Sequence, residues 1–75
     1  MPKFYVDLSK FESVKRFVEL TSNKSCFCLL KSGRYTVDAK SILGIFSLDL
    51  SRPVEFEIGD GDYAMFEGFR INSEV

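Results

Sequence analysis

Short runs of β-prone and helically spaced apolar residues open the chain. Residues 4–8 (Phe-Tyr-Val-Asp-Leu) are rich in aromatic and branched side chains, which predicts a first strand. Over residues 9–22, apolar side chains recur every three or four positions, which predicts a helix with one apolar face. Ser9 and Glu12 have the spacing of a capping box at the start of this helix.

The middle of the chain predicts a hairpin. Residues 26–30 (Cys-Phe-Cys-Leu-Leu) are apolar without alternation, which is typical of a central strand buried on both faces. A turn over residues 31–34 and a β-prone run over residues 35–37 complete the hairpin.

A second helix, a strand and a last short helix are predicted to follow. Residues 39–49 favour a short helix, which Gly44 weakens by about 1 kcal/mol relative to alanine. Residues 54–58 alternate between apolar and acidic side chains, as a half-buried strand does. Asp62 is placed to cap a weak final helix.

This β-α-β-β-α-β-α order predicts an α+β fold in one domain over residues 1–75. Because each helix has a single apolar stripe, we expect an open-faced two-layer sandwich, with the helices on one face of a mostly antiparallel, four-stranded sheet. The main core candidates are Phe11, Val14, Phe17, Val18, Phe27, Leu29, Val37, Val54, Phe56 and Ile58.

Composition excludes several chemistries. The chain has 75 residues and no histidine, so it cannot form a Ser-His-Asp or Cys-His catalytic site or carry phosphohistidine. No apolar run approaches the roughly 20 residues of a membrane span, and no signal peptide is recognisable, so we expect a cytoplasmic protein without membrane contact. No convergent set of polar groups is visible, and we expect no enzymatic activity.

Charge is distributed unevenly along the chain. Residues 1–40 contain eight Lys or Arg against four Asp or Glu, and residues 41–75 contain two against seven, which together give the net charge of −1. The lysines are scattered and not interleaved with aromatic residues. We therefore expect a solvated basic face and no nucleic-acid partner.

Two short patterns allow a metal or redox interpretation beside a structural one. Cys26 and Cys28 could form half of a metal or redox site, but without further cysteines or a histidine they fit two small buried apolar residues better. Asp60, Asp62 and Glu67 resemble part of a calcium loop, but a turn followed by a helix cap explains them better. We expect no metal and no cofactor.

The segment Lys40-Ser41-Ile42-Leu43-Gly44-Ile45-Phe46-Ser47-Leu48 resembles the signature around the regulatory serine of HPr, the phosphocarrier protein of the bacterial sugar phosphotransferase system. Residues 17–19 resemble the end of the first helix of that family, and residues 54–58 resemble its fourth strand. The resemblance covers most of the chain and implies an HPr-like fold, in agreement with the predicted order of elements.

The chain departs from the family at the catalytic loop. HPr carries phosphate on a histidine between its first strand and first helix, followed by an arginine and a proline. This chain passes from Leu8 to Ser9-Lys10-Phe11-Glu12, and its last helix is shorter. Lys10 lies near the position of the histidine, but a protonated lysine is a poor phosphate acceptor. Phosphocarrier activity is therefore excluded by composition.

The sequence leaves open whether Ser41 is regulated by phosphorylation. In the family, an ATP-dependent kinase modifies this serine, and the apolar residues after it bind partner proteins. The resemblance makes Ser41 a candidate phosphorylation site in the first turn of a helix, and makes Lys40, Ile42, Leu43 and Phe46 candidate partner-binding residues. The alternative is that Ser41 is simply a polar surface residue. We expect Ser41 and at least two of the three apolar candidates to be exposed, with Ile45 and Leu48 facing inward.

The resemblance implies a non-catalytic regulatory or interaction domain, whose partner is a protein of the phosphotransferase or carbon-regulation network. The alternative is an HPr-fold domain reused as a subunit or adaptor with no link to sugar transport. The sequence carries no signal for the oligomeric state.

Overall fold

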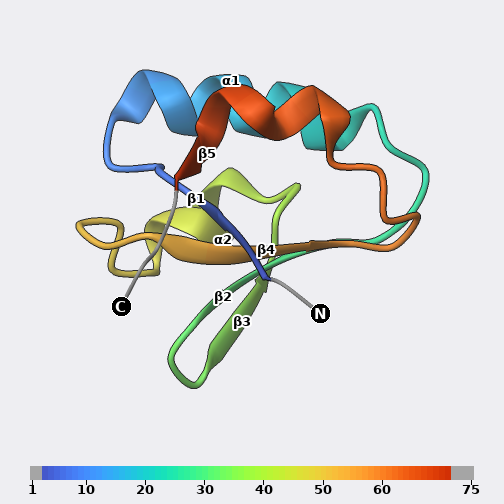
Figure 1. Ribbon diagram of the computed structural model, residues 1–75. Helices are drawn as coiled ribbons and strands as arrows, with labels where there is room; N and C mark the ends of the chain where they lie inside the picture. The colour runs from blue at the N-terminus through green and yellow to red at the C-terminus, as the bar shows by residue number, and fades with distance from the viewer. Residues whose placement is uncertain (1–2, 72–75) are drawn as a thin grey trace.

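The computed structural model describes residues 3–71, and the other residues of the predicted 1–75 domain lie outside it. Five strands and three helical segments follow one another along the chain (Figure 1). They are β1 (Phe4–Val6), α1 (Phe11–Ser22), β2 (Cys28–Ser32), β3 (Tyr35–Asp38), α2 (Ile42–Phe46), β4 (Val54–Ile58), the 3₁₀-helix η1 (Ala64–Phe69) and β5 (Arg70–Ile71).

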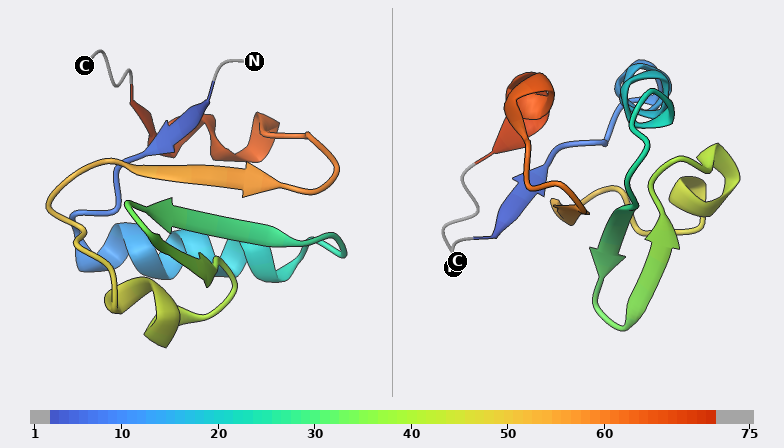
Figure 2. Two further views of the ribbon diagram at one scale, coloured as in Figure 1. Left: turned by 90° about the horizontal axis from the view of Figure 1, so that it is seen from below. Right: turned by 90° about the vertical axis from the view of Figure 1, so that its right-hand side faces the viewer.

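The strands form one antiparallel sheet in the order β3-β2-β4-β1-β5. The helices lie on one face of this sheet, and the other face is open (Figure 2). The predicted two-layer α+β sandwich is therefore observed, but with five strands instead of four. The additional strand, β5, pairs Ile71 with Tyr5 and Arg70 with Val6. Two residues are too few to show alternation, so the sequence pattern could not reveal it.

The core lies between the helices and the sheet and is built around aromatic rings. Phe17 of α1 contacts Phe56 of β4 with ring centroids 4.9 Å apart, and it contacts Phe66 and Phe69 of η1 at 5.4 and 5.3 Å. Phe56 also packs edge-on against Phe66 at 4.8 Å. These contacts hold α1, η1 and β4 together, and each edge-to-face pair adds about 0.5–1.5 kcal/mol beyond simple burial.

The predicted boundaries of the helices were too wide. α1 begins at Phe11, because Ser9 does not cap it: the amide and hydroxyl of Ser9 both donate to Asp7 Oδ1, at 3.0 and 2.7 Å. The capping box was therefore a wrong prediction. α2 has five residues, and the last helix is a 3₁₀ segment, with Asp62 Oδ1 accepting from the Ala64 amide at 3.1 Å.

Half of the predicted core residues are fully buried: Val14, Phe17, Val54, Phe56 and Ile58. Val18, Leu29 and Val37 are half-buried. Phe11 and Phe27 were wrong predictions, since they are 60% and 54% exposed.

The prediction that residues 26–30 form a strand buried on both faces was also wrong. β2 begins at Cys28 and alternates, with Cys28 and Leu30 buried in the core and Leu29, which points to the opposite face, half-buried. Leu29 lies beside Glu57 of β4 and Asp38 of β3, so its surroundings on that face are polar.

Candidate protein-interaction site

Ser41 is the N-cap of α2 and not a residue of its first turn. Its Oγ accepts from the Gly44 amide at 3.1 Å, and its carbonyl accepts from the Ile45 amide at 3.0 Å. Its own amide donates to the Asp38 carbonyl at 3.0 Å, which ties the cap to the end of β3. The residue is half-buried, so the expectation of an exposed Ser41 was wrong. The hydroxyl is occupied because a helix this short depends on its cap.

Gly44 lies at a contact between α2 and β3. A β-carbon at this position would lie 3.3 Å from Ser41 Oγ and 3.5 Å from the β-carbon of Val37. The glycine therefore permits the serine cap and the contact between α2 and β3 at the same point. The sequence pattern showed only its helix-weakening effect.

Two of the three apolar partner-binding candidates point outward. Leu43 is 81% exposed and Phe46 is 43% exposed, while Ile42 is half-buried. Ile45 and Leu48 are buried in the core, as predicted. A one-and-a-half-turn helix can bury only one stripe, and Ile45 occupies it.

Phe11 of α1 extends this apolar surface. Its ring stacks on the ring of Phe46, with centroids 5.7 Å apart and planes 11° apart. The Lys15 ammonium lies 5.8 Å from the centroid of Phe11. We refer to Phe11, Ile42, Leu43 and Phe46 as the α2 patch. Contiguous exposed apolar residues of this size are typical of interaction surfaces.

Sequence reasoning missed Phe11 as a surface residue, although its helical angle carried the signal. At about 100° per residue, Phe11 lies roughly 90° from the direction shared by the buried Val14, Phe17 and Thr21. It therefore sits at the edge of the apolar stripe, where a neighbouring element decides whether the side chain is covered.

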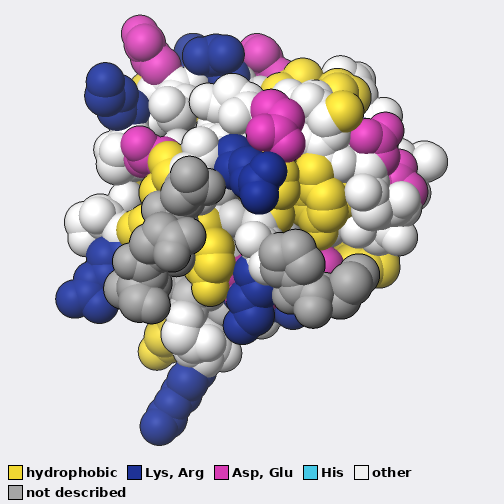
Figure 3. Space-filling model, viewed as in Figure 1, with side chains coloured by type: hydrophobic (Ala, Val, Ile, Leu, Met, Phe, Trp, Pro, Cys, Tyr) yellow, Lys and Arg dark blue, Asp and Glu magenta, His cyan; other side chains and the backbone are white. Residues whose placement is uncertain are grey.

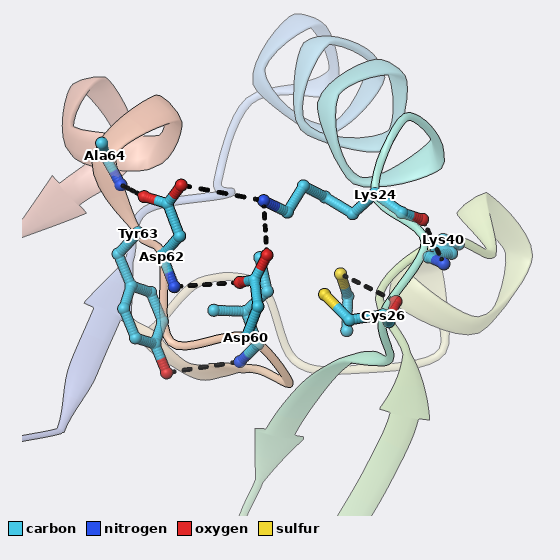
Figure 4. A network of polar contacts seen from close by, with 9 residues as sticks. Lys24, Cys26, Lys40, Asp60, Asp62, Tyr63 and Ala64 are labelled. Atoms are coloured by element: carbon cyan, nitrogen blue, oxygen red, sulfur yellow. Dashed lines mark hydrogen bonds and ion pairs between the residues drawn. The ribbon is translucent and has the colours of Figure 1, made fainter.

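Two hydrogen bonds hold the segment before α2 against the C-terminal end of α1 and the residues that follow it. Thr21 is fully buried, and its Oγ1 donates to the Ala39 carbonyl at 2.9 Å. The Lys40 ammonium donates to the Lys24 carbonyl at 2.8 Å (Figure 4). Lys40, predicted to bind a partner, thus points toward the end of α1 and helps to anchor the chain.

The acidic loop predicted as a turn is closed by a lysine. Lys24 Nζ lies 2.8 Å from Asp60 Oδ2 and 3.9 Å from Asp62 Oδ2 (Figure 4). Asp60 Oδ1 accepts from the Asp62 amide at 2.9 Å. The hydrogen bond from Lys24 lowers the pKa of Asp60, and the same bond raises the pKa of Lys24. Glu67, the third residue of the calcium interpretation, pairs with Arg70 at 3.5 Å.

The two cysteines differ in burial. Both are free, Cys28 is buried, and Cys26 is half-buried. Burial raises the pKa of the Cys28 thiol, which disfavours the nucleophilic thiolate. Among residues 3–71, no group of three or more Cys, Asp or Glu side chains is arranged to hold a metal ion.

The loop between β1 and α1 contains ordinary turn chemistry. Lys10 is exposed, and its carbonyl accepts from the Val14 amide at 3.1 Å. The hydrogen bonds from Ser9 lower the pKa of Asp7, so this carboxylate is a weak base toward the Ser9 hydroxyl.

No family model, curated protein or solved structure matches this chain. Within the described residues, no helix has the length and apolarity that crossing a membrane requires. The face shown in Figure 3 displays acidic, basic and apolar side chains interspersed. The candidate site therefore rests on its own geometry.

Proposed function

We propose that this chain is a non-catalytic, HPr-like interaction domain that binds a protein partner through the α2 patch. The observation that carries the proposal is the exposure of Leu43 and Phe46 directly after the capping Ser41, with Phe11 stacked beside them. An aromatic pair next to an exposed leucine offers the rigid apolar anchors that dominate protein interfaces.

Charge around the patch indicates the kind of partner. Lys10 is the N-cap of α1 and Lys15 lies in its second turn, with the Lys15 ammonium 5.8 Å from the centroid of the Phe11 ring. A partner with an apolar pocket rimmed by carboxylates would complement this surface. The resemblance assigns such a partner to the phosphotransferase or carbon-regulation network.

Ser41 would regulate this surface if a kinase modified it. A phosphate adds about −1.5 to −2 charges at the N-terminus of α2, where the Gly44 amide that now donates to Ser41 Oγ can donate to a phosphate oxygen. Because Ser41 directly precedes the five residues of α2, the added charge would lie beside the α2 patch and would change which partners the patch accepts.

Two measurements test this function. Phosphoenolpyruvate with the first enzyme of the system should leave the chain unlabelled, because there is no histidine; stable label would contradict the proposal. Partner recovery from native cells should fall at least tenfold for Phe46→Ala and stay unchanged for Met65→Ala. Met65 is a matched control, because it is 46% exposed against 43% for Phe46 and lies on η1. Equal recovery for both variants would contradict a role for the patch.

A further inference from the structure

β3 forms one edge of the sheet, and in residues 3–71 no strand pairs with its outer side. Three of its four residues are exposed, and Tyr35 reaches 72%. The β2–β3 hairpin extends away from the helical layer (Figure 2). An edge of this kind presents unpaired amides and carbonyls to another strand.

The register shows which backbone groups are available. The Ala39 amide donates to the Cys28 carbonyl at 2.8 Å, so this pair bonds directly across the ladder. Bonded and non-bonded pairs alternate in antiparallel sheets. Val37 therefore faces β2, whereas the Thr36 amide and carbonyl and the Asp38 amide are directed away from the sheet. The Asp38 carbonyl accepts from the Ser41 amide at 3.0 Å.

An antiparallel copy of β3 centred on Thr36 matches this edge in charge. In that register Thr36 lies opposite its own counterpart, and Arg34, the turn residue directly before β3, is brought beside Asp38 of the other copy. Asp38 Oδ1 accepts from the Lys40 amide, which leaves Oδ2 for the arginine. Tyr35 lies beside Val37 of the second copy, so the exposed ring gains an apolar neighbour.

The neighbouring register is disfavoured. Centring the pair on Val37 would place Arg34 opposite Lys40, two like charges, and Asp38 opposite Thr36, so the pairing of Arg34 with Asp38 would be lost. Charged residues usually protect edge strands because like charges meet. Here Arg34 and Asp38, four positions apart, have opposite charges, so each of them meets its opposite charge in an antiparallel second copy.

We propose that β3 pairs with β3 of a second copy of this chain, antiparallel and centred on Thr36, which makes one continuous sheet across a two-fold dimer. The contact involves only one short strand from each copy, so the dimer is weak and forms at high chain concentration. It uses a different surface from the α2 patch and does not depend on the proposed function.

The test is sedimentation equilibrium combined with amide NMR spectra over a dilution series from millimolar to low micromolar chain. We expect a monomer–dimer equilibrium, with concentration-dependent shifts concentrated at residues 34–38. Arg34→Asp should raise the dissociation constant at least tenfold, because each opposite-charge pair becomes a pair of aspartates. Arg52→Asp, the same charge change at another exposed arginine, should change it less than twofold.

Three results would overturn the proposal. One is a monomer at every concentration. Another is an equal effect of Arg34→Asp and Arg52→Asp on the dissociation constant, which would show that net charge, and not the pairing of Arg34 with Asp38, controls self-association. The third is a dimer that Phe46→Ala abolishes and Arg34→Asp does not, which would assign self-association to the α2 patch.

Discussion

The buried hydroxyl of Thr21 offers a precise test of how α1 positions α2. Thr21→Val keeps the volume of the side chain and removes its donor, so the Ala39 carbonyl loses its 2.9 Å bond in a fully buried place. Leaving a buried acceptor unpaired costs about 1–3 kcal/mol. We therefore expect Thr21→Val to lower the free energy of unfolding by about 2 kcal/mol.

Urea and thermal unfolding followed by circular dichroism measure this loss. With a slope near 1 kcal/mol per molar urea, the midpoint should fall by about 2 M. The melting temperature should fall by about 8–16 °C for a domain of this size. Thr21→Ser is the control, because it keeps the hydroxyl and loses one buried methyl group, at a cost of about 1 kcal/mol. A Thr21→Val protein as stable as the natural chain would refute the reasoning.

Three further predictions concern the cap, the acidic loop and the core. Ser41→Ala should lower the free energy of unfolding by about 1 kcal/mol in urea titrations, because the Gly44 amide loses its acceptor. The pKa of Asp60, measured by NMR titration, should lie below the ordinary 3.8 and return toward it in Lys24→Met; the stabilisation exists above pH 3.8 and disappears as pH falls through the lowered pKa. Phe17→Ala should cost about 3–5 kcal/mol and leave the chain largely unfolded by circular dichroism, whereas the exposed Phe27→Ala should cost under about 1 kcal/mol.

The class of fold could be predicted from the sequence because periodicity reports burial on each element. Alternation over Val54–Ile58 and helical spacing along α1 both reflect the side of the element that meets the core. Ile45 and Leu48 were placed inward by the resemblance to HPr and not by periodicity, and both are buried.

Features that depend on neighbouring elements could not be predicted. Phe11 is exposed because the α2 helix offers it a surface ring to stack on and no cover. Ser9 does not form the predicted capping box with Glu12. Its amide donates to Asp7, two residues earlier, and is therefore not available to the Glu12 carboxylate. Lys40 bonds to a carbonyl at the end of α1, a contact between residues sixteen apart that no local pattern contains.

The α2 patch combined predictable and unpredictable parts. Some apolar residues of α2 could be expected outward because the helix carries more of them than one stripe can bury, and the resemblance to HPr pointed to Leu43 and Phe46 among them. That Phe11 completes the surface required knowing how α1 and α2 pack.

Photo-crosslinking from position 43 tests the central claim that the α2 patch is a binding surface. A benzophenone amino acid replaces Leu43 in the full chain, and in a second protein it replaces Met65 on η1. In native cells, position 43 should give one discrete adduct with a partner protein. An excess of the unmodified chain should reduce this adduct, and an excess of the Phe46→Ala chain should not. Adducts that are identical from positions 43 and 65, or absent from position 43, would contradict the account.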